Sequence, residues 1–536
     1  MNPERPHKPS PMQPIWFALV LVVGMFIGTN LSDRNILQVK PTLEENANKL
    51  VSLIDYIEDN YVDSIDKHKL IDDAIESILQ NLDPHSYYLT SEEVALEKER
   101  MRGEFSGIGI EFLILRDTLM VVKTIEGGPS EAAGLKAGDR IITVDGNPIS
   151  GKELNSERAQ KLLKGKQGTR VNVGVYRPGE KAALAIEIER NAIPIESVLA
   201  CMMVDKEIGY IKLDRFAERT YDEFMKGVSS LKSEGCKSLI LDLRGNGGGL
   251  LAQAAEIVEE FLPENQVIVR TKGLHQGVDE IRSSKNGTYQ DMKVVVLIDQ
   301  SSASASEIVA GALQDLDRST TVGRRSFGKG LVQHELELAD KSALRLTVAR
   351  YYTPSGRCIQ KPYGDSIQYR EDFQHRMKSG ELLSADSIHF PDSLKYKTLK
   401  GKIVYGGGGI MPDIFVPLDS MYFSGILSEV SFGGVIRDFS FNYIDSHRLE
   451  LKNYKSAEDF IRRFQVTDGM MMELIAMANK EQGKSNSAAI GKISSHLKSR
   501  IKAQITRNLF DQDAMYRVLL DSDADFQKAL KVLTEN

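Results

Sequence analysis

The strongest constraint on the fold is an apolar strand that runs directly into a small-residue turn and a helix. The strand reads KVVVLID (residues 293–299), and the turn that follows reads SSASAS. A helix is predicted next, over residues 307–316, with an apolar stripe made by Ile308, Val309, Ala312 and Leu313. Alternation of such strands with crossover helices predicts an α/β core.

The same stretch carries groups suited to nucleophilic catalysis. Ser304 would lie at the helix N-terminus, Lys329 stands between two glycines in FGKG, and Gln333 follows four residues later. A serine hydroxyl needs a base to remove its proton, and a Ser-Lys pair is a known variant. The lysine must then be neutral, which desolvation favours. No acidic residue lies within five positions of Lys329 on either side.

Neighbouring groups could assist this chemistry. The amide oxygen of Gln333 can accept a hydrogen bond and orient the amine, and the backbone amide of Ala305 can donate to a developing oxyanion. The alternative is that the serines of the turn are only capping residues and that Lys329 is an exposed turn lysine. Spacing alone leaves both interpretations open.

A family resemblance favours the catalytic interpretation. The run SASASEIVAGALQD, with FGKG and the glutamine after it, closely resembles the carboxyl-terminal processing peptidases, also called tail-specific proteases or S41 serine peptidases. The likeness covers roughly residues 45–420. It implies that Ser304 is the nucleophile, Lys329 the general base and Gln333 the residue that orients the lysine. It also implies a crotonase-like (ClpP/crotonase type) core and no cofactor.

A glycine-rich turn provides a second candidate element of the site. The segment KSLILDLRGNGGGLL (residues 237–251) is typical of a buried strand that enters a glycine turn and then a helix. It lacks the GK[ST] ending and the dinucleotide spacing of phosphate-binding loops. In the resembled family this loop supplies an oxyanion amide, for which Gly248 or Gly249 fits, because a side chain there would block the approaching carbonyl. Arg244 and Asn246 are interpreted as loop-locking residues.

Residues 103–189 change to short strands and glycine turns. The segments FSGIGIEF and GGPSEAAGLKAGDRIITVDGNPI together resemble a PDZ domain. Such a domain captures a chain terminus by adding it to a sheet edge and binding its carboxylate with backbone amides. The residues that match the carboxylate-binding loop are Gly107, Ile108, Gly109 and Ile110.

The N-terminal segment indicates export. Residues 15–28 read IWFALVLVVGMFIG behind Arg5 and Lys8, as in a secretory signal or an uncleaved anchor. Fourteen residues fall short of the about 18 that span a bilayer, but counting to Leu31 brings the run close. No A-x-A cleavage signal follows, which favours a signal anchor. We therefore expect a cytoplasmic segment 1–14, an anchor or signal peptide 15–31, and periplasmic domains in a bacterial cell envelope, anchored to the inner membrane or secreted.

Composition narrows the classes of partner. The formal net charge of −7 gives no reason to expect nucleic acid as a ligand. Three cysteines lie far apart in the sequence and form no metal or redox spacing, and no HExxH motif or histidine cluster indicates a metal.

The predicted organisation is therefore an α/β multidomain protein. A helical region (42–102) precedes the PDZ domain (103–189), the S41 peptidase core (190–420) and a helical C-terminal extension (421–536). Residues 362–400 are interpreted as a surface insertion. For the extension, a homodimer contact, an adaptor site and simple packing all remain open.

The predicted function is a serine endopeptidase that binds unstructured C-termini of protein substrates through its PDZ domain and cleaves them. Two alternatives remain. One is a catalytically silent PDZ/crotonase-like binding or scaffold protein, and the other is an acyl-CoA hydratase or isomerase, since the implied core is shared. Export of the chain argues against the second, because CoA thioesters are cytoplasmic.

Overall fold

The computed structural model describes residues 44–535, except 116, 152, 365, 420–433 and 483–492. The chain divides into two compact units, Met1–Leu79 and Gln80–Asn536. The predicted N-terminal segment (1–14) and anchor (15–31) lie outside the described residues. Within the described ranges, no helix has the length and apolar character needed to cross a membrane.

The described part of the first unit is a helical pair, α2 (Glu44–Asn60) and α3 (Lys67–Gln80). Lys67, at the start of α3, contacts Asp55 and Glu58 of α2 at 2.8 and 2.6 Å. These ion pairs are partly exposed, so their contribution to stability is small.

The second unit contains a six-stranded sheet that positions the site. Its strands, in spatial order, are β10 (Val198–Met203), β11 (Ile208–Leu213), β12 (Ser238–Asp242), β15 (Lys293–Ile298), β16 (Ser319–Gly323) and β21 (Ile414–Phe415). β10 is antiparallel to β11, and all the other pairs are parallel. The turns that leave β12, β15 and β16 therefore lie at one edge of the sheet, where α/β proteins build their sites.

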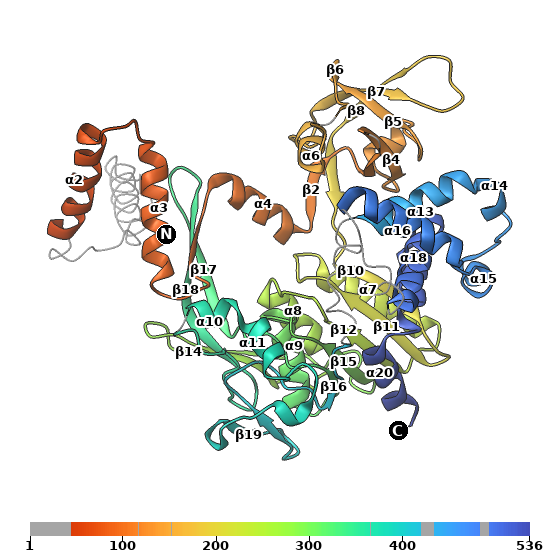
Figure 1. Cartoon of the computed structure of the whole chain (residues 1–536). Coiled ribbons are helices and arrows are strands. Elements are labelled where there is room, and N and C mark those ends of the chain that lie inside the picture. Colours follow the sequence, from red (N-terminus) through yellow and green to blue (C-terminus); the bar gives the residue numbers. More distant parts are fainter. Residues whose placement is uncertain are drawn as a thin grey trace, which may run out of the picture. The chain divides into compact units, whose positions relative to one another are not determined.

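Both faces of this sheet are buried, which explains the continuous apolar strands. On one face, Leu241 and Val296 pack under helices α7 (Thr220–Ser233), α8 (Leu251–Glu259) and α9 (Ala305–Asp315). On the other, their neighbours Ile240, Val295 and Leu297 pack under α19 (Gln512–Leu520) and α20 (Ala524–Thr534) from the end of the chain (Figure 1). The α/β character predicted for the core is thus present.

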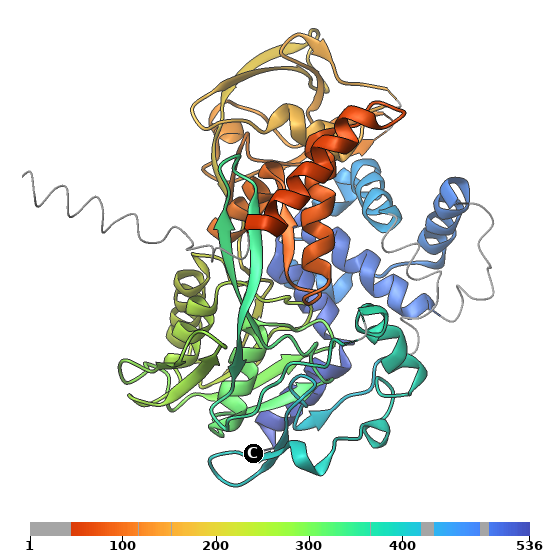
Figure 2. The same cartoon turned by 90° about the vertical axis from the view of Figure 1, so that its left-hand side faces the viewer.

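A second sheet flanks the first. It consists of β1 (Tyr87–Leu89), β18 (Ala343–Tyr352), β13 (Val267–Lys272) and β14 (Val278–Arg282), with β17 (Leu331–Glu337) also paired to β18. β17 and β18 form a long antiparallel ribbon (Figure 2). After β18, the chain turns at Pro354, Ser355 and Gly356 and forms only an isolated bridge, between Tyr352 and Cys358.

Residues 104–194 form a separate sheet with its own apolar core. The strands and helices are β2 (Glu104–Gly107), β3 (Ile110–Leu115), β4 (Thr118–Thr124), α5 (Pro129–Ala132), β5 (Arg140–Val144), β6 (Asn147–Pro148), α6 (Ser156–Leu163), β7 (Arg170–Tyr176), β8 (Leu184–Glu189) and β9 (Asn191–Pro194). The sheet order is β3-β4-β5-β7-β8, so β3 is an edge strand. β2 pairs with β9 where the chain enters and leaves this region.

The described residues after 433 are mainly helical. Its helices are α13 (Val435–Ser446), α14 (Arg448–Leu451), α15 (Ala457–Arg463), α16 (Asp468–Gln482) and α18 (Ser494–Leu509), followed by α19 and α20. Phe439, Phe460, Leu474 and Ile501 share one buried cluster. The helix-rich character expected of the extension is present over its described residues.

The interpretation of residues 362–400 as a surface insertion is wrong in part. The segment forms α10 (Ser366–Arg370), α11 (Asp372–Lys378), two 3-10 turns (Ala385–Ser387 and Asp392–Leu394) and β19 (Lys395–Lys397), which pairs with β20 (Ile403–Tyr405). Leu382 and Arg376 are buried, and Arg376 donates to the carbonyl of Ser326 at 3.2 Å. The polar composition indicated an exposed segment, but Arg376 can be buried because its guanidinium pairs with Glu381, which also pairs with Arg325.

Candidate active site

The three segments that carry the predicted site follow neighbouring parallel strands. The glycine-rich turn follows β12, Ser304 follows β15, and Lys329 follows β16. Since β15 pairs with β12 on one side and with β16 on the other, the fold brings all three segments to one edge of the sheet.

Ser304 lies at the N-terminus of α9 in an unusual backbone conformation, with φ 55° and ψ −114°. A non-glycine residue in this region carries strain of about 1–3 kcal/mol, which the surroundings must sustain. The turn is held from both sides of Ser304, because the Ala303 amide and the Ser306 hydroxyl both donate to the Asn246 carbonyl, at 3.0 and 2.9 Å. The turn that carries Ser304 and the glycine-rich turn are therefore joined by hydrogen bonds.

A buried carboxylate joins the serine and lysine segments. Glu307 Oε2 accepts from the backbone amides of Ser304 and Lys329, at 2.9 and 2.8 Å. Its Oε1 accepts from the Gly328 amide at 2.8 Å and the Ser326 hydroxyl at 2.5 Å. Burial raises the pKa of Glu307, and these four donors oppose the rise. Because every neighbour donates, the arrangement matches the ionised form.

A tyrosine hydroxyl joins the same two segments from another side. Tyr351 Oη lies 3.0 Å from the Ser304 carbonyl oxygen and 2.6 Å from the Lys329 carbonyl oxygen. Tyr351 is 1 % exposed, and burial raises the pKa of its phenol well above the usual value, so the hydroxyl keeps its proton. Glu307 accepts from the two amides, and the single proton of the Tyr351 hydroxyl lies between the two carbonyls, so both main chains are fixed relative to each other.

Lys329 and Gln333 are in direct contact. The Lys329 amine donates to Gln333 Oε1 at 3.1 Å, and the Gln333 amide nitrogen donates to the His85 carbonyl. The His85 carbonyl accepts only the NH₂ group, so it directs the amide oxygen of Gln333 toward the lysine. Burial lowers the pKa of Lys329, Arg345 adds to this effect, and Glu307 opposes it. No hydrogen bond joins the Ser304 hydroxyl to the Lys329 amine among the described contacts.

A cavity of about 430 Å³ opens over Ser304. Its lining includes Ser304, Ala305, Gly249 and Gln333, with apolar walls from Leu250, Ile308 and Leu331. Helix α4 (Ser91–Arg102) contributes Glu97, Lys98 and Met101 to the rim. Four of the predicted site residues thus face one space that is large enough for a peptide segment.

Gly248 and Gly249 differ in their hydrogen bonds and contacts. The Gly248 amide donates to Asn246 Oδ1 at 2.8 Å, while Gly249 lines the cavity. Both have positive φ, 101° and 144°. A Cβ on Gly248 would lie 2.7 Å from the Ser304 Cβ, and one on Gly249 would lie 2.2 Å from the Phe216 oxygen. Only glycine fits either position, and among the described hydrogen bonds the Gly248 amide has an acceptor whereas the Gly249 amide has none.

The predicted carboxylate-binding loop leads into the edge strand β3. Gly107, Ile108 and Gly109 are buried, and Ile110 begins β3. The Ile108 side chain is 2 % exposed and belongs to the apolar core of this region. A cavity of about 600 Å³ lies beside the loop, lined in part by Ser106, Lys161 and Lys164.

Sequence reasoning missed Glu307, Tyr351 and His85. Glu307 carried a detectable signal, since a serine with glutamate three residues later is the pattern of a capping box. Tyr351 and His85 reach the site only through β18 and the turn before β1, and nothing local in the sequence announces this. No group of three or more metal-ligating side chains gathers within the described ranges.

Comparison with known families identifies three segments. Residues 207–367 match peptidase family S41, and residues 106–188 match the PDZ domain. Residues 426–511 match a family of unknown function, DUF8443.

Curated relatives match a large part of the chain. The carboxy-terminal-processing protease of Bartonella bacilliformis is 38% identical over 352 residues, which span 64% of this chain and 80% of the relative. The carboxy-terminal processing protease CtpB of Bacillus subtilis is 32% identical over 63% of this chain and 72% of its own length. The solved photosystem II D1 C-terminal processing protease is 29% identical over 57% of this chain and 88% of that chain, with a TM-score of 0.32. The chain belongs to peptidase family S41, as a carboxy-terminal processing protease with a PDZ domain.

Proposed function

We propose that the protein is a serine endopeptidase in which Ser304 is the nucleophile, Lys329 the general base and Gln333 the group that orients the lysine. The observation that carries this proposal is the double link between the Ser304 and Lys329 main chains, made by Glu307 and Tyr351 beside one cavity. A structural serine and a structural lysine would not require such a link.

In the proposed reaction, neutral Lys329 removes the proton of the Ser304 hydroxyl while Oγ attacks the peptide carbonyl. The amides of Ala305 and Gly249 donate to the resulting oxyanion. The Lys329 ammonium then returns its proton to the leaving amine, and water hydrolyses the acyl-enzyme. The lowered pKa of Lys329 supports the first step, because a larger fraction of the amine is neutral at a given pH.

The substrate is a protein with an unstructured C-terminus. A terminal segment would add to the edge strand β3 and present its carboxylate to the amides of residues 107–110. We further infer that PDZ occupancy gates the core by moving Lys329 into reach of Ser304.

The place of action is the bacterial cell envelope. The apolar run 15–31 supports an inner-membrane anchor with periplasmic domains, or secretion to the periplasm, and the relatives compared above are bacterial proteins. We retain the domain division 42–102, 103–189, 190–420 and 421–536, and a crotonase-like core, which the parallel sheet with helices on its face supports.

A serine-directed fluorophosphonate tests the assignment. The full chain is expected to be labelled once per molecule, and Ser304→Ala is expected to abolish both labelling and peptide cleavage. Ser301→Ala is the matched control, since Ser301 is exposed in the same turn. Labelling that persists in Ser304→Ala, or is absent from the wild type, would contradict the proposal and favour a silent scaffold protein.

The PDZ role needs its own measurement. A peptide with a free C-terminus is expected to show a lower KM than the same peptide with a C-terminal amide. If the gate operates, adding a second, uncleaved peptide with a free C-terminus also accelerates fluorophosphonate labelling. An unchanged labelling rate would reject the gate but would not contradict the roles proposed for Ser304 and Lys329.

A further inference from the structure

The end of the chain places a buried carboxylate at the edge of the catalytic sheet. Asp525 lies in the first turn of α20 and is 5 % exposed. The same helix packs Phe526 and Ala529 onto the sheet face opposite α9. Asp523 caps the helix by accepting from the Phe526 amide at 3.0 Å. This segment follows the region that matches the family of unknown function.

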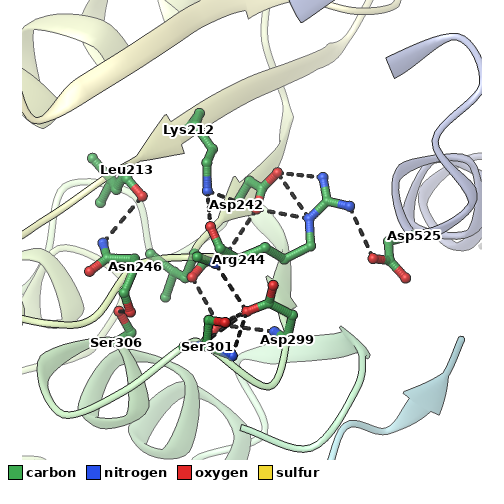
Figure 3. A network of polar contacts seen from close by, with 12 residues as sticks. Lys212, Leu213, Asp242, Arg244, Asn246, Asp299, Ser301, Ser306 and Asp525 are labelled. Atoms are coloured by element: carbon green, nitrogen blue, oxygen red, sulfur yellow. Dashed lines mark hydrogen bonds and ion pairs between the residues drawn. The ribbon is translucent and has the colours of Figure 1, made fainter. Parts of the chain in front are cut away.

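Asp525 binds two arginines at once. Its Oδ1 and Oδ2 accept from the two terminal nitrogens of Arg324, both at 2.9 Å, in a bidentate pair. Its Oδ2 also accepts from Arg244 at 3.0 Å, the contact drawn in Figure 3. Bidentate pairs fix geometry as well as charge. Asp525 therefore joins Arg324, which directly follows β16, to Arg244, which is the second residue after β12.

Arg244 leads into the glycine-rich turn. Its guanidinium also contacts Asp242 and Asp523, and its carbonyl accepts from Lys212. The next amide, that of Gly245, donates to Asp299 Oδ1 at 3.0 Å, which also accepts from the Ser302 amide. Displacement of Arg244 would therefore shift both the glycine-rich turn and the turn that carries Ser304.

Arg324 leads toward the lysine. It lies five residues before Lys329, and its Nε donates to Gln300 Oε1 at 3.1 Å. Gln300 belongs to the turn between β15 and Ser304. One carboxylate from the far end of the chain thus connects the turns after β12, β15 and β16, which are the three segments of the proposed site.

The ion pairs of Asp525 with Arg244 and Arg324 hold these side chains in place. Burial disfavours the charged form of Arg244, but Asp242 and Asp523 hold its pKa well above the usual value. Arg324 is 6 % exposed, and Asp525 is its carboxylate partner among the described ion pairs. Removing one member of a buried pair leaves an uncompensated charge, which must move toward water or toward another partner.

We propose that Asp525 is a positioning residue for catalysis, which holds the three turns at the carboxyl edge of the sheet in register from the C-terminal helix. The proposal rests on the assignment of Ser304 and Lys329 above. It gives the last segment of the extension a role within the same molecule, distinct from an adaptor or dimer contact.

The test compares Asp525→Asn with Asp521→Asn in the full chain. Both substitutions remove one negative charge, but Asp521 is exposed at the end of α19. Active sites are counted with the fluorophosphonate, and kcat and KM are measured on a short peptide. We expect Asp525→Asn to lower kcat per labelled site at least tenfold with KM within twofold of wild type, and Asp521→Asn to match the wild type.

A second readout separates positioning from folding. A peptide boronate forms a tetrahedral adduct on the serine, so its affinity reports the oxyanion donors. We expect its Ki to rise in Asp525→Asn by the same factor as kcat/KM falls. Wild-type kcat per labelled site in Asp525→Asn, even with a lowered Tm, would overturn the proposal.

Two other results of this experiment also decide the proposal. If Asp525→Asn does not fold, Arg324→Lys, which keeps the charge but loses the bidentate pair, is expected to lower kcat per labelled site, and a wild-type value would overturn the proposal. Failure of the dyad assignment is distinguishable, because the wild type itself would then not be labelled at Ser304.

Discussion

The protease core and the PDZ domain differ in the groups that they bury. At the edge of the core that carries the candidate site, Glu307, Arg324 and Asp525 are buried ionisable groups that join loops. The PDZ domain has an almost wholly apolar core, and its buried ion pair, Asp139 with Arg177, lies at one turn. A reacting site must fix several backbones against strain, whereas a strand-binding site needs only an open edge. Substitutions should therefore affect turnover in one region, and affinity or stability in the other.

The largest expected effect comes from Lys329→Met. Without a base, attack by Ser304 slows, and kcat should fall on the order of 10⁴-fold or more. Lys329→Arg should not restore it, because the guanidinium does not give up its proton. Peptide hydrolysis per folded molecule, with circular dichroism as the check of folding, measures the loss. Activity of the arginine variant near the wild-type level would remove Lys329 from the mechanism.

Glu307→Gln should have the next largest effect. The amide keeps one oxygen but turns an NH₂ group toward backbone donors that now lack an acceptor, at a cost of about 2 kcal/mol in the free energy of unfolding. Because those donors belong to Ser304, Gly328 and Lys329, kcat should fall about 100-fold. Urea unfolding and steady-state kinetics check the two values. Loss of stability with unchanged kcat would make Glu307 purely structural.

The sequence allowed us to predict which residues of the two main-chain turns form the candidate site, but not the side chains that hold these turns together. Ser304, Ala305 and Lys329 stood out because their chemistry depends on residue type and local context. The fold places them together because parallel strands end at one edge, which follows from the strand–helix alternation. The links through Tyr351 and His85 depend on the register of β18 and on a turn that precedes β1, and pairing register between distant segments leaves no local signature.

Two charged groups have partners that the local sequence does not show. The environment of Lys329 contains no acid in the sequence, yet the fold brings the Glu307 carboxylate to its amide from 22 residues earlier. Polar residues in 362–400 suggested a surface, but Arg376 is buried with Glu381. In both cases a charge is satisfied by a distant partner, which composition does not record.

Arg177→Met should affect the PDZ domain alone. Arg177 donates to both oxygens of Asp139, at 2.7 Å each, and Asp139 is 1 % exposed. Leaving that carboxylate without its cation should cost about 3 kcal/mol of PDZ stability. The matched control is Arg170→Met, since Arg170 pairs with Glu187 at the exposed surface of the same sheet, where such a pair is worth at most about 1 kcal/mol.

The kinetic readout of these two variants sharpens the comparison. Arg177→Met should raise KM for a substrate with a free C-terminus about tenfold through the unfolded fraction of the domain, while fluorophosphonate still labels Ser304. A fall in labelling equal to that of Glu307→Gln would show that the two regions are not separable in this way.

The smallest effect is on the pH dependence of stability. The pKa of Lys329 is lowered from 10.5 by burial, so between the folded and unfolded values the unfolded state binds the proton that the folded state lacks. The free energy of unfolding should therefore rise with pH across that window and level off above 10.5. Lys329→Met should lack this rise and be more stable than the wild type at neutral pH, because no amine needs to be desolvated.

Urea unfolding between pH 6 and 11 measures this pH dependence of the free energy of unfolding. The control is Lys166→Met, which replaces an exposed lysine of the PDZ domain and whose curve should parallel that of the wild type. Parallel curves for wild type and Lys329→Met would mean that placing the half-buried amine of Lys329 in the core does not lower the free energy of unfolding.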